Sequence, residues 1–206
     1  MRIVSDSWFR RRLHRRPYRW LATAPGEFCS LKDAGRLADT FPTEGFVRRN
    51  ESGRACGKRY RNFSRPLNWP EDEGALGAEW RQLVADLLSA DYRDHVAQVL
   101  GQERADELEL RLVYHGSGDW LGPHTDRDDK LFSHIIYFNR AWSADWGGCL
   151  QILTHDDPAS VVATISPELG ASILLERADN SWHQVTEVSP DAPAQRRSLL
   201  IHGLRR

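Results

Sequence analysis

The sequence predicts an α+β fold that is mainly β, with helices in the N-terminal half and a β-sandwich or barrel in the C-terminal half. Apolar side chains recur at helical spacing between residues 76 and 100. After residue 106 the chain carries short apolar runs bounded by Gly, Pro, Asp or Asn, which is typical of several strands joined by turns. No polar linker separates the halves. We therefore expect one domain, 1–206, with a helical and irregular part, 1–106, and a β core, 107–206.

Composition limits the classes of function. The 206 residues are 40% hydrophobic and 28% charged, with a formal net charge of -1, so the chain as a whole has no electrostatic reason to bind nucleic acid or a membrane. No apolar run approaches the roughly 18 residues that a spanning helix needs. Cys29, Cys56 and Cys149 are too scattered for a disulfide framework or a thiolate metal site. We expect a cytoplasmic protein with a small-molecule substrate; the sequence indicates no oligomeric state.

Two helical segments are predicted in the N-terminal half. Ser30 begins the first as a cap, and Phe41-Pro42 ends it. The second covers 76–100, with Asp91 restarting it as a second N-cap. Extended pieces at 46–49 and 59–63 surround a predicted turn at Ser52-Gly53.

An arginine-rich segment lies upstream of these helices. Six arginines and several aromatic residues alternate between residues 8 and 20. The segment is either an arm that grips phosphates or a short helix, capped by Ser5 or Asp6, with its aromatics in the core and its arginines in solvent. We favour the second interpretation, because no second basic cluster of equal density follows.

The C-terminal half predicts a series of strands. Each is a short apolar run between turn residues, and none has helical spacing. The predicted strands cover 108–114, 131–138, 149–153, 161–165, 171–175, 182–188 and 198–204. Gly147-Gly148 is interpreted as a tight connection between two of them.

The strongest chemical signal is His124-Thr125-Asp126. On an extended segment, residues two apart point to the same side, so this imidazole and this carboxylate can share a metal ion. His183 is the best third ligand, with His155 and His202 as rivals. Two imidazoles and one carboxylate form a facial triad that leaves coordination positions open, as in non-haem iron(II) oxygenases, although zinc accepts the same ligand types.

A second signal lies on the last predicted strand. Alternation places Arg196 and Ser198 on one face and Arg197 on the other, and a shift of one residue would exchange the two arginines. A guanidinium and a hydroxyl that project together can hold a carboxylate. A dicarboxylate could then reach from the metal to Arg196, which is what a 2-oxoglutarate enzyme requires.

Residues 108–204 resemble the prolyl-4-hydroxylase-like branch of the iron(II)/2-oxoglutarate dioxygenases. The matching pieces, in order, are Tyr114 to Asp126 (YHGSGDWLGPHTD), Ile136 to Asn139 (IYFN), Trp146 to Leu150 (WGGCL), His183, and Arg196-x-Ser198. The resemblance implies a double-stranded β-helix, or jelly roll. It also implies iron(II), O2 and 2-oxoglutarate as cofactor and co-substrates, with ascorbate as a possible reductant, and no catalytic residue beyond the metal centre.

The sequence departs from that branch in two respects, of which the first is that the resemblance does not extend to the N-terminal half. Leu121 stands where many members carry a tyrosine that contacts 2-oxoglutarate, so we expect Tyr114 or Tyr137 to supply the hydroxyl. Related halogenases have a small residue in place of the carboxylate ligand. The presence of Asp126 therefore favours hydroxylation.

The expected reaction is hydroxylation of an unactivated carbon in a small polar metabolite, such as an amino acid, an amino-acid derivative or a natural-product intermediate. A peptidyl-prolyl or nucleic-acid-modifying oxygenase is the first alternative, and a non-enzymatic, cupin-like metal-binding module is the second. The candidate substrate-binding residues are Arg59, Arg61, Arg127, Trp142 and Trp182.

Overall fold

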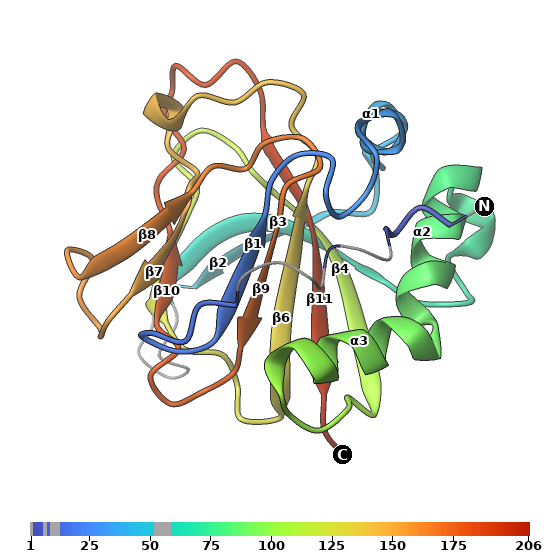
Figure 1. The fold of residues 1–206 in the computed structure, drawn as a ribbon. Coiled ribbons are helices and arrows are strands. Elements are labelled where there is room, and N and C mark those ends of the chain that lie inside the picture. Colours follow the sequence, from blue (N-terminus) through green and yellow to red (C-terminus); the bar gives the residue numbers. More distant parts are fainter. Residues whose placement is uncertain (1, 6–7, 9–12, 52–58) are drawn as a thin grey trace.

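The computed structural model describes residues 2–5, 8, 13–51 and 59–206, and within them the fold is mainly antiparallel β (Figure 1). One continuous sheet runs in the order β1-β9-β6-β11-β4-β3-β5-β10-β7-β8, with β2 added beside β3. The strands are β1 (Trp20–Thr23), β2 (Val47–Glu51), β3 (Tyr60–Leu67), β4 (Glu107–His115), β5 (Trp120–His124), β6 (Lys130–Tyr137), β7 (Leu150–Leu153), β8 (Val161–Ile165), β9 (Ser172–Glu176), β10 (His183–Val185) and β11 (Arg196–Leu204).

Strand β3 is the corner at which the sheet folds over on itself. Its C-terminal part pairs with β4 and its first residues pair with β5, so one strand belongs to both layers. The larger layer contains β9, β6, β11 and β4, and the smaller contains β5, β10, β7 and β8 (Figure 1). This arrangement confirms the predicted mainly β, jelly-roll fold class.

The helices α1 (Leu31–Asp39), α2 (Ala78–Leu88) and α3 (Ala90–Leu100) cover the outer face of the larger layer (Figure 1). An apolar cluster joins them to the outward side chains of the central strands, such as Leu112, Phe132 and Leu199. A second cluster, which includes Trp20, Ile152 and Ile173, fills the space between the layers. Both faces of the central strands are buried. Close packing on the outer face therefore holds the inner face, where the polar site lies, in a fixed position.

The predicted helix boundaries are partly confirmed. Ser30 caps α1 and accepts a hydrogen bond from the backbone N–H of Asp33 at 3.1 Å. The cap of α3, however, is Ser89 and not Asp91, which lies in the first turn. Ser89 Oγ accepts the backbone N–H of Tyr92 at 3.3 Å, the bond that an N-cap side chain makes, whereas Asp91 lies two residues further along, inside the helix. No helix among the described residues is long and apolar enough to cross a membrane.

The predicted short helix near the N-terminus is not found over residues 13–19, while residues 6–7 and 9–12, where it would begin, lie outside the described residues. Residues 13–19 are irregular and lead into β1, which pairs with β9, so strand pairing has replaced helix formation there. Tyr18 and Trp20 are buried, as expected, and Arg19 forms an ion pair with Glu176. Arg10, Arg11, Arg12, Cys56 and the Ser52-Gly53 turn lie outside the described residues.

Candidate active site

Two histidines face each other across neighbouring strands. His124 ends β5 and His183 begins β10, and the antiparallel register places them directly opposite. Their ring centroids are 4.1 Å apart. Each ring donates its Nδ1–H to a nearby carbonyl oxygen at 2.9 Å, that of Gly122 for His124 and that of Ser181 for His183. Each ring therefore keeps the lone pair of Nε2, the tautomer that a metal ligand needs.

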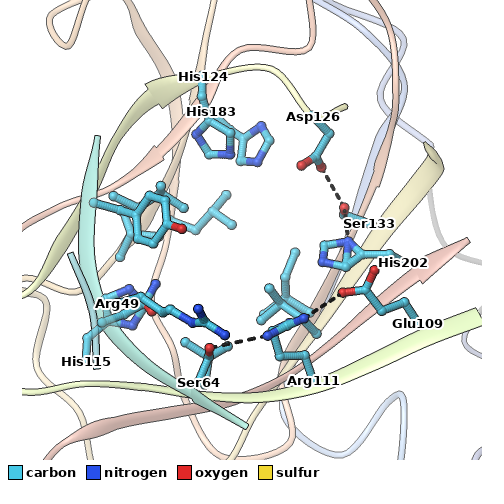
Figure 2. Close-up of a pocket in the computed structure, with 18 of the residues that line it drawn as sticks. Arg49, Ser64, Glu109, Arg111, His115, His124, Asp126, Ser133, His183 and His202 are labelled. Carbon is cyan, nitrogen blue, oxygen red and sulfur yellow. Dashed lines mark hydrogen bonds and ion pairs between the residues drawn. The ribbon is translucent and has the colours of Figure 1, made fainter. Parts of the chain in front are cut away.

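Asp126 completes the group of three. Its carboxylate and the two imidazoles each offer a ligand atom, and these atoms all lie within 4.8 Å of one another. All three residues are buried, and Figure 2 shows them at one end of the pocket. The structure thus brings together the three residues predicted as metal ligands. His155, one rival, is exposed in the loop after β7.

A buried polar network holds the Asp126 carboxylate. Lys130 Nζ donates to Oδ1 at 2.8 Å, and Ser133 Oγ donates to Oδ2 at 2.6 Å. His202, the rival ligand, joins the network through Ser133, with Nδ1 at 3.0 Å from Ser133 Oγ. Because Ser133 gives its proton to the carboxylate, His202 is the donor to Ser133. The network orients the carboxylate, and His202 contributes to that network.

Arg196 lies elsewhere in the same cavity, on the inner face of β11. Its side chain is 2% exposed, and Nε donates to the Gly148 carbonyl oxygen at 2.6 Å. The guanidinium lies over the Tyr137 ring, 5.0 Å from the centroid, and Nη1 is 3.4 Å from Ser198 Oγ. Gly148 has a φ of +64°, and a Cβ there would lie 3.1 Å from Arg196 Cδ, so a larger residue would disturb the guanidinium.

Two polar atoms beside Arg196 have no hydrogen-bond partner among the described residues. They are His115 Nε2 and Tyr137 Oη, and both side chains are buried. Burial, and secondarily the charge of Arg196, holds the pKa of His115 well below its ordinary value, so the ring is neutral. Burial raises the pKa of Tyr137 to about 12, so the phenol keeps its proton. Unpaired buried polar atoms are costly and indicate that a ligand supplies their missing bonds.

Strand alternation decides which of the other predicted co-substrate residues face this pocket. Arg197 points to the opposite face, with its guanidinium 5.4 Å from the Phe41 ring centroid. Tyr114 also points outward and stacks on Phe63 at 4.6 Å. The expectation that Tyr114 contacts the co-substrate is therefore corrected, because on β4 it is the neighbouring residue, His115, whose side chain faces inward.

The metal-ligand group and Arg196 share one cavity of about 420 Å³ (Figure 2). This volume lies in the range of ligand-binding pockets, roughly 300–1,000 Å³. The other walls are polar and come from strands β2, β3 and β4 and from the segment after β5. Their polar residues are Arg49, Tyr60, Asn62, Ser64, Glu109, Arg111 and Arg127.

Only Arg127 of the predicted substrate-binding residues lines this cavity. Arg59 is exposed, and Arg61 donates to the Gly118 carbonyl oxygen. Trp142 Nε1 donates to the Gly147 carbonyl oxygen at 2.9 Å, and Trp182 is half-buried beside the metal ligand His183 without lining the cavity. None of these four side chains lines the cavity that the described residues form, and their contact with a substrate stays a prediction.

Sequence reasoning missed several residues that do line the cavity. Ser133 stands four residues before Tyr137 on β6, and even spacing on one strand is a signal that could have identified it. His202, which the sequence offered only as a rival metal ligand, lies six residues after Arg196 on β11 and also faces the cavity. Lys130 and Glu109 gave no local signal, because charged residues at strand ends are ordinarily solvated.

The fold and the site define a jelly roll in which two histidines and one aspartate form a candidate site for one metal ion, in the same cavity as a buried arginine. Residues 110–203 match the family model described as the 2OG-Fe(II) oxygenase superfamily. The matched residues include His124, Asp126, His183 and Arg196, so the part of the chain that carries the site is similar to the 2OG-Fe(II) oxygenase superfamily. That family uses Fe(2+), 2-oxoglutarate and O2.

Two curated relatives that match carry the name of a prolyl 3-hydroxylase. The protein "Prolyl 3-hydroxylase OGFOD1" of Xenopus laevis is 28% identical over 109 residues, which are 51% of this chain and 21% of that protein. The Mus musculus protein of the same name is 26% identical over 106 residues, which are 50% of this chain and 19% of the relative. The matched part thus spans about a fifth of the length of these relatives.

Solved structures share the fold over most of the chain. A Pseudomonas putida prolyl-4-hydroxylase has a TM-score of 0.67 at 18% identity, covering 91% of this chain and 92% of that one. A Trichoplax adhaerens prolyl hydroxylase, solved with a hypoxia inducible factor peptide fragment, has a TM-score of 0.64 at 15% identity, covering 90% of this chain and 83% of that one. A Burkholderia pseudomallei 2OG-Fe(II) oxygenase family protein has a TM-score of 0.60 at 18% identity, covering 91% and 85%.

The residues present fit the groups that this family uses. Iron(II) accepts two imidazole nitrogens and one carboxylate, the donor set of His124, His183 and Asp126. A dicarboxylate fits the buried Arg196, because a carboxylate oxygen would satisfy the guanidinium and the orphaned phenol of Tyr137 together.

Proposed function

We propose that this chain is an iron(II)- and 2-oxoglutarate-dependent hydroxylase, with His124, Asp126 and His183 as metal ligands and Arg196 as the anchor of the co-substrate. One observation carries the proposal. A single cavity contains both the metal-ligand group and a buried guanidinium, and two orphaned polar atoms lie beside that guanidinium. A protein that only bound a metal would gain nothing from a buried arginine with unpaired neighbours, which costs folding free energy.

Each residue of the site has a defined task. When bound, iron and 2-oxoglutarate supply the oxidative step, in which O2 is reduced, 2-oxoglutarate becomes succinate and carbon dioxide, and a substrate carbon gains a hydroxyl. Arg196, with Tyr137 and Ser198 beside it, would hold a carboxylate of 2-oxoglutarate. Ser133 and Lys130 fix the direction of the Asp126 carboxylate. The apolar side chains of Leu150 and Val185 line the cavity between these polar groups and limit the entry of water.

The charged and amide side chains on the cavity wall favour a small polar metabolite, such as an amino acid or its derivative, as the substrate. Charged and amide side chains line the space that remains beside the co-substrate. A prolyl residue of a peptide is the second candidate, supported by relatives that are prolyl hydroxylases. Nucleic acid has less support, because among the described arginines of the N-terminal segment only Arg15 and Arg16 are exposed.

The test is succinate formation by the purified chain with ferrous iron, 2-oxoglutarate, ascorbate and pools of candidate substrates. We expect 2-oxoglutarate to bind only after iron and succinate to rise with the correct pool. His124→Ala is the matched negative variant. Iron binding without any 2-oxoglutarate binding would instead support the cupin-like, non-enzymatic alternative and overturn the proposal.

A further inference from the structure

The cavity wall opposite the metal-ligand group carries more positive than negative charge. Figure 2 shows Arg49, Ser64 and Arg111 on this side, with Glu109 nearby. Glu109 is the only carboxylate among the described lining residues apart from Asp126, and it is already engaged. It accepts from Arg111 at 3.0 Å and lies 3.6 Å from Arg127. Arg127 is paired with Asp129 outside the cavity as well. The remaining positive charge belongs to Arg49.

Arg49 is the cavity arginine without a partner. No hydrogen bond or ion pair joins its guanidinium to any other residue in the described part of the chain, whereas Arg111, Arg127 and Arg196 all have polar partners. It projects from β2 toward the cavity, while its neighbour Arg48 projects from the other face and pairs with Asp119. An unpaired guanidinium at a pocket mouth can bind a carboxylate in a bidentate manner.

A second, independent feature lies beside Arg49. Asn62 on β3 is directly opposite Arg49 in the β2–β3 register. Asn62 also lines the cavity, and its Oδ1 is buried without a hydrogen-bond partner among the described residues. A buried amide oxygen without a donor costs free energy until a ligand donates to it. The pair therefore offers a cation for a carboxylate and, next to it, an acceptor for an N–H group.

We propose, on the basis of the function proposed above, that Arg49 and Asn62 form the substrate anchor and select a compound with a free carboxylate next to an amino or amide N–H. An amino acid or the C-terminal residue of a peptide has this chemistry. An internal residue of a peptide lacks the carboxylate. Iron, Lys130 and Arg196 carry more formal positive charge than Asp126 and 2-oxoglutarate carry negative charge, so the loaded site has no excess anion to neutralise Arg49.

The first experiment compares three pools by succinate release from the full chain: free L-amino acids, their N-acetyl derivatives and their C-terminal amides. We expect at least one carboxylate pool to raise succinate above the substrate-free level, and the amide pool to fail. Activity with the free pool alone identifies a free amino acid, and activity with the N-acetyl pool identifies a C-terminal residue. An active amide pool overturns the proposal, as do two inactive carboxylate pools when 2-oxoglutarate still binds. Loss of 2-oxoglutarate binding itself would contradict the proposed function instead.

The second experiment uses Arg49→Gln with the most active carboxylate compound. We expect the KM of that compound to rise at least about tenfold, because a charge-assisted pair is lost, while 2-oxoglutarate binding stays unchanged. Arg49→Lys should recover part of the loss, because lysine keeps the positive charge but cannot form the bidentate hydrogen bonds of a guanidinium. Arg81→Gln, on the exposed face of α2, is the matched control and should behave as the unchanged chain. An unchanged KM in Arg49→Gln would overturn the role of Arg49.

Discussion

Arg196 Nη1 lies 3.5 Å from Nδ1 of His115, and both side chains are buried on the inner faces of paired strands. A neutral histidine beside a buried guanidinium accepts on the nitrogen that faces it. The remaining proton is then on Nε2, which has no partner among the described residues. The pair is therefore prepared to receive an anion, because the arginine supplies the charge and the histidine a further donor.

Replacing Arg196 should separate metal binding from co-substrate binding. Arg196→Ala removes the buried charge but touches none of the metal ligands, so iron should bind as before. The affinity for 2-oxoglutarate should fall by about 2–5 kcal/mol, the range for truncating one member of a buried charge pair. Calorimetric titration with metal and then with 2-oxoglutarate measures both.

The neighbouring arginine provides the control for that experiment. Arg197→Ala acts on the opposite face of β11, above the Phe41 ring, and should leave both affinities unchanged. If Arg197→Ala lost 2-oxoglutarate and Arg196→Ala kept it, the register of β11 and the proposed anchor would both be wrong.

The two tyrosines considered for the co-substrate should differ in effect. Tyr137→Phe removes the orphaned hydroxyl near Arg196 and should weaken 2-oxoglutarate binding by about 0.5–1.5 kcal/mol, the net worth of one hydrogen bond. Tyr114→Phe alters a ring stacked on Phe63 outside the cavity and should have no effect. The apparent Kd for 2-oxoglutarate in each variant measures this difference, and equal losses would argue against the assignment of Tyr137.

Metal binding should stabilise the fold only while the third ligand is present. A ligand at 100 times its Kd raises the free energy of unfolding by about 2.7 kcal/mol, which appears as a higher Tm. We expect Fe(2+), added without oxygen, to raise the Tm of the unchanged chain and of His155→Ala, whose histidine is exposed. His183→Ala should show no such rise. A full metal-dependent shift in His183→Ala would exclude His183 as a ligand.

Strand alternation explains how much of the site could be predicted from the sequence. His124 and Asp126, and likewise Arg196 and Ser198, are spaced by two, and the structure places each pair on one side. Tyr114 could not be placed in this way, since both faces of β4 are covered and an aromatic residue suits either.

Turn geometry and strand pairing explain why other residues of the site could not be predicted from the sequence. Lys130 reaches Asp126 only because the turn after β5 brings the start of β6 back to the metal-ligand group. Arg49 lies on β2, whose residues are all exposed, so the pattern of apolar residues does not indicate which face of this strand points inward. The direction of the Arg49 side chain follows from its pairing with Asn62. Neither contact follows from local periodicity, because the first depends on the shape of a turn and the second on the register between β2 and β3.

The buried His134 should make the fold sensitive to acid. Its ring lies between Tyr92 Oη, 2.8 Å from Nδ1, and Ser172 Oγ, 3.0 Å from Nε2, and burial lowers its pKa to about 3. In the unfolded chain the pKa of a histidine is about 6.5, so below that pH the unfolded state binds a proton that the folded state refuses. Stability should therefore fall as the pH drops from about 6.5 toward 3, by up to about 1.4 kcal/mol per pH unit for this histidine.

Denaturant unfolding at several pH values measures how steeply the free energy of unfolding depends on pH. His134→Gln, which keeps an amide donor and acceptor but does not titrate, should be less stable at neutral pH and should lose less stability on acidification. An identical slope in both proteins would show that His134 is not the group responsible.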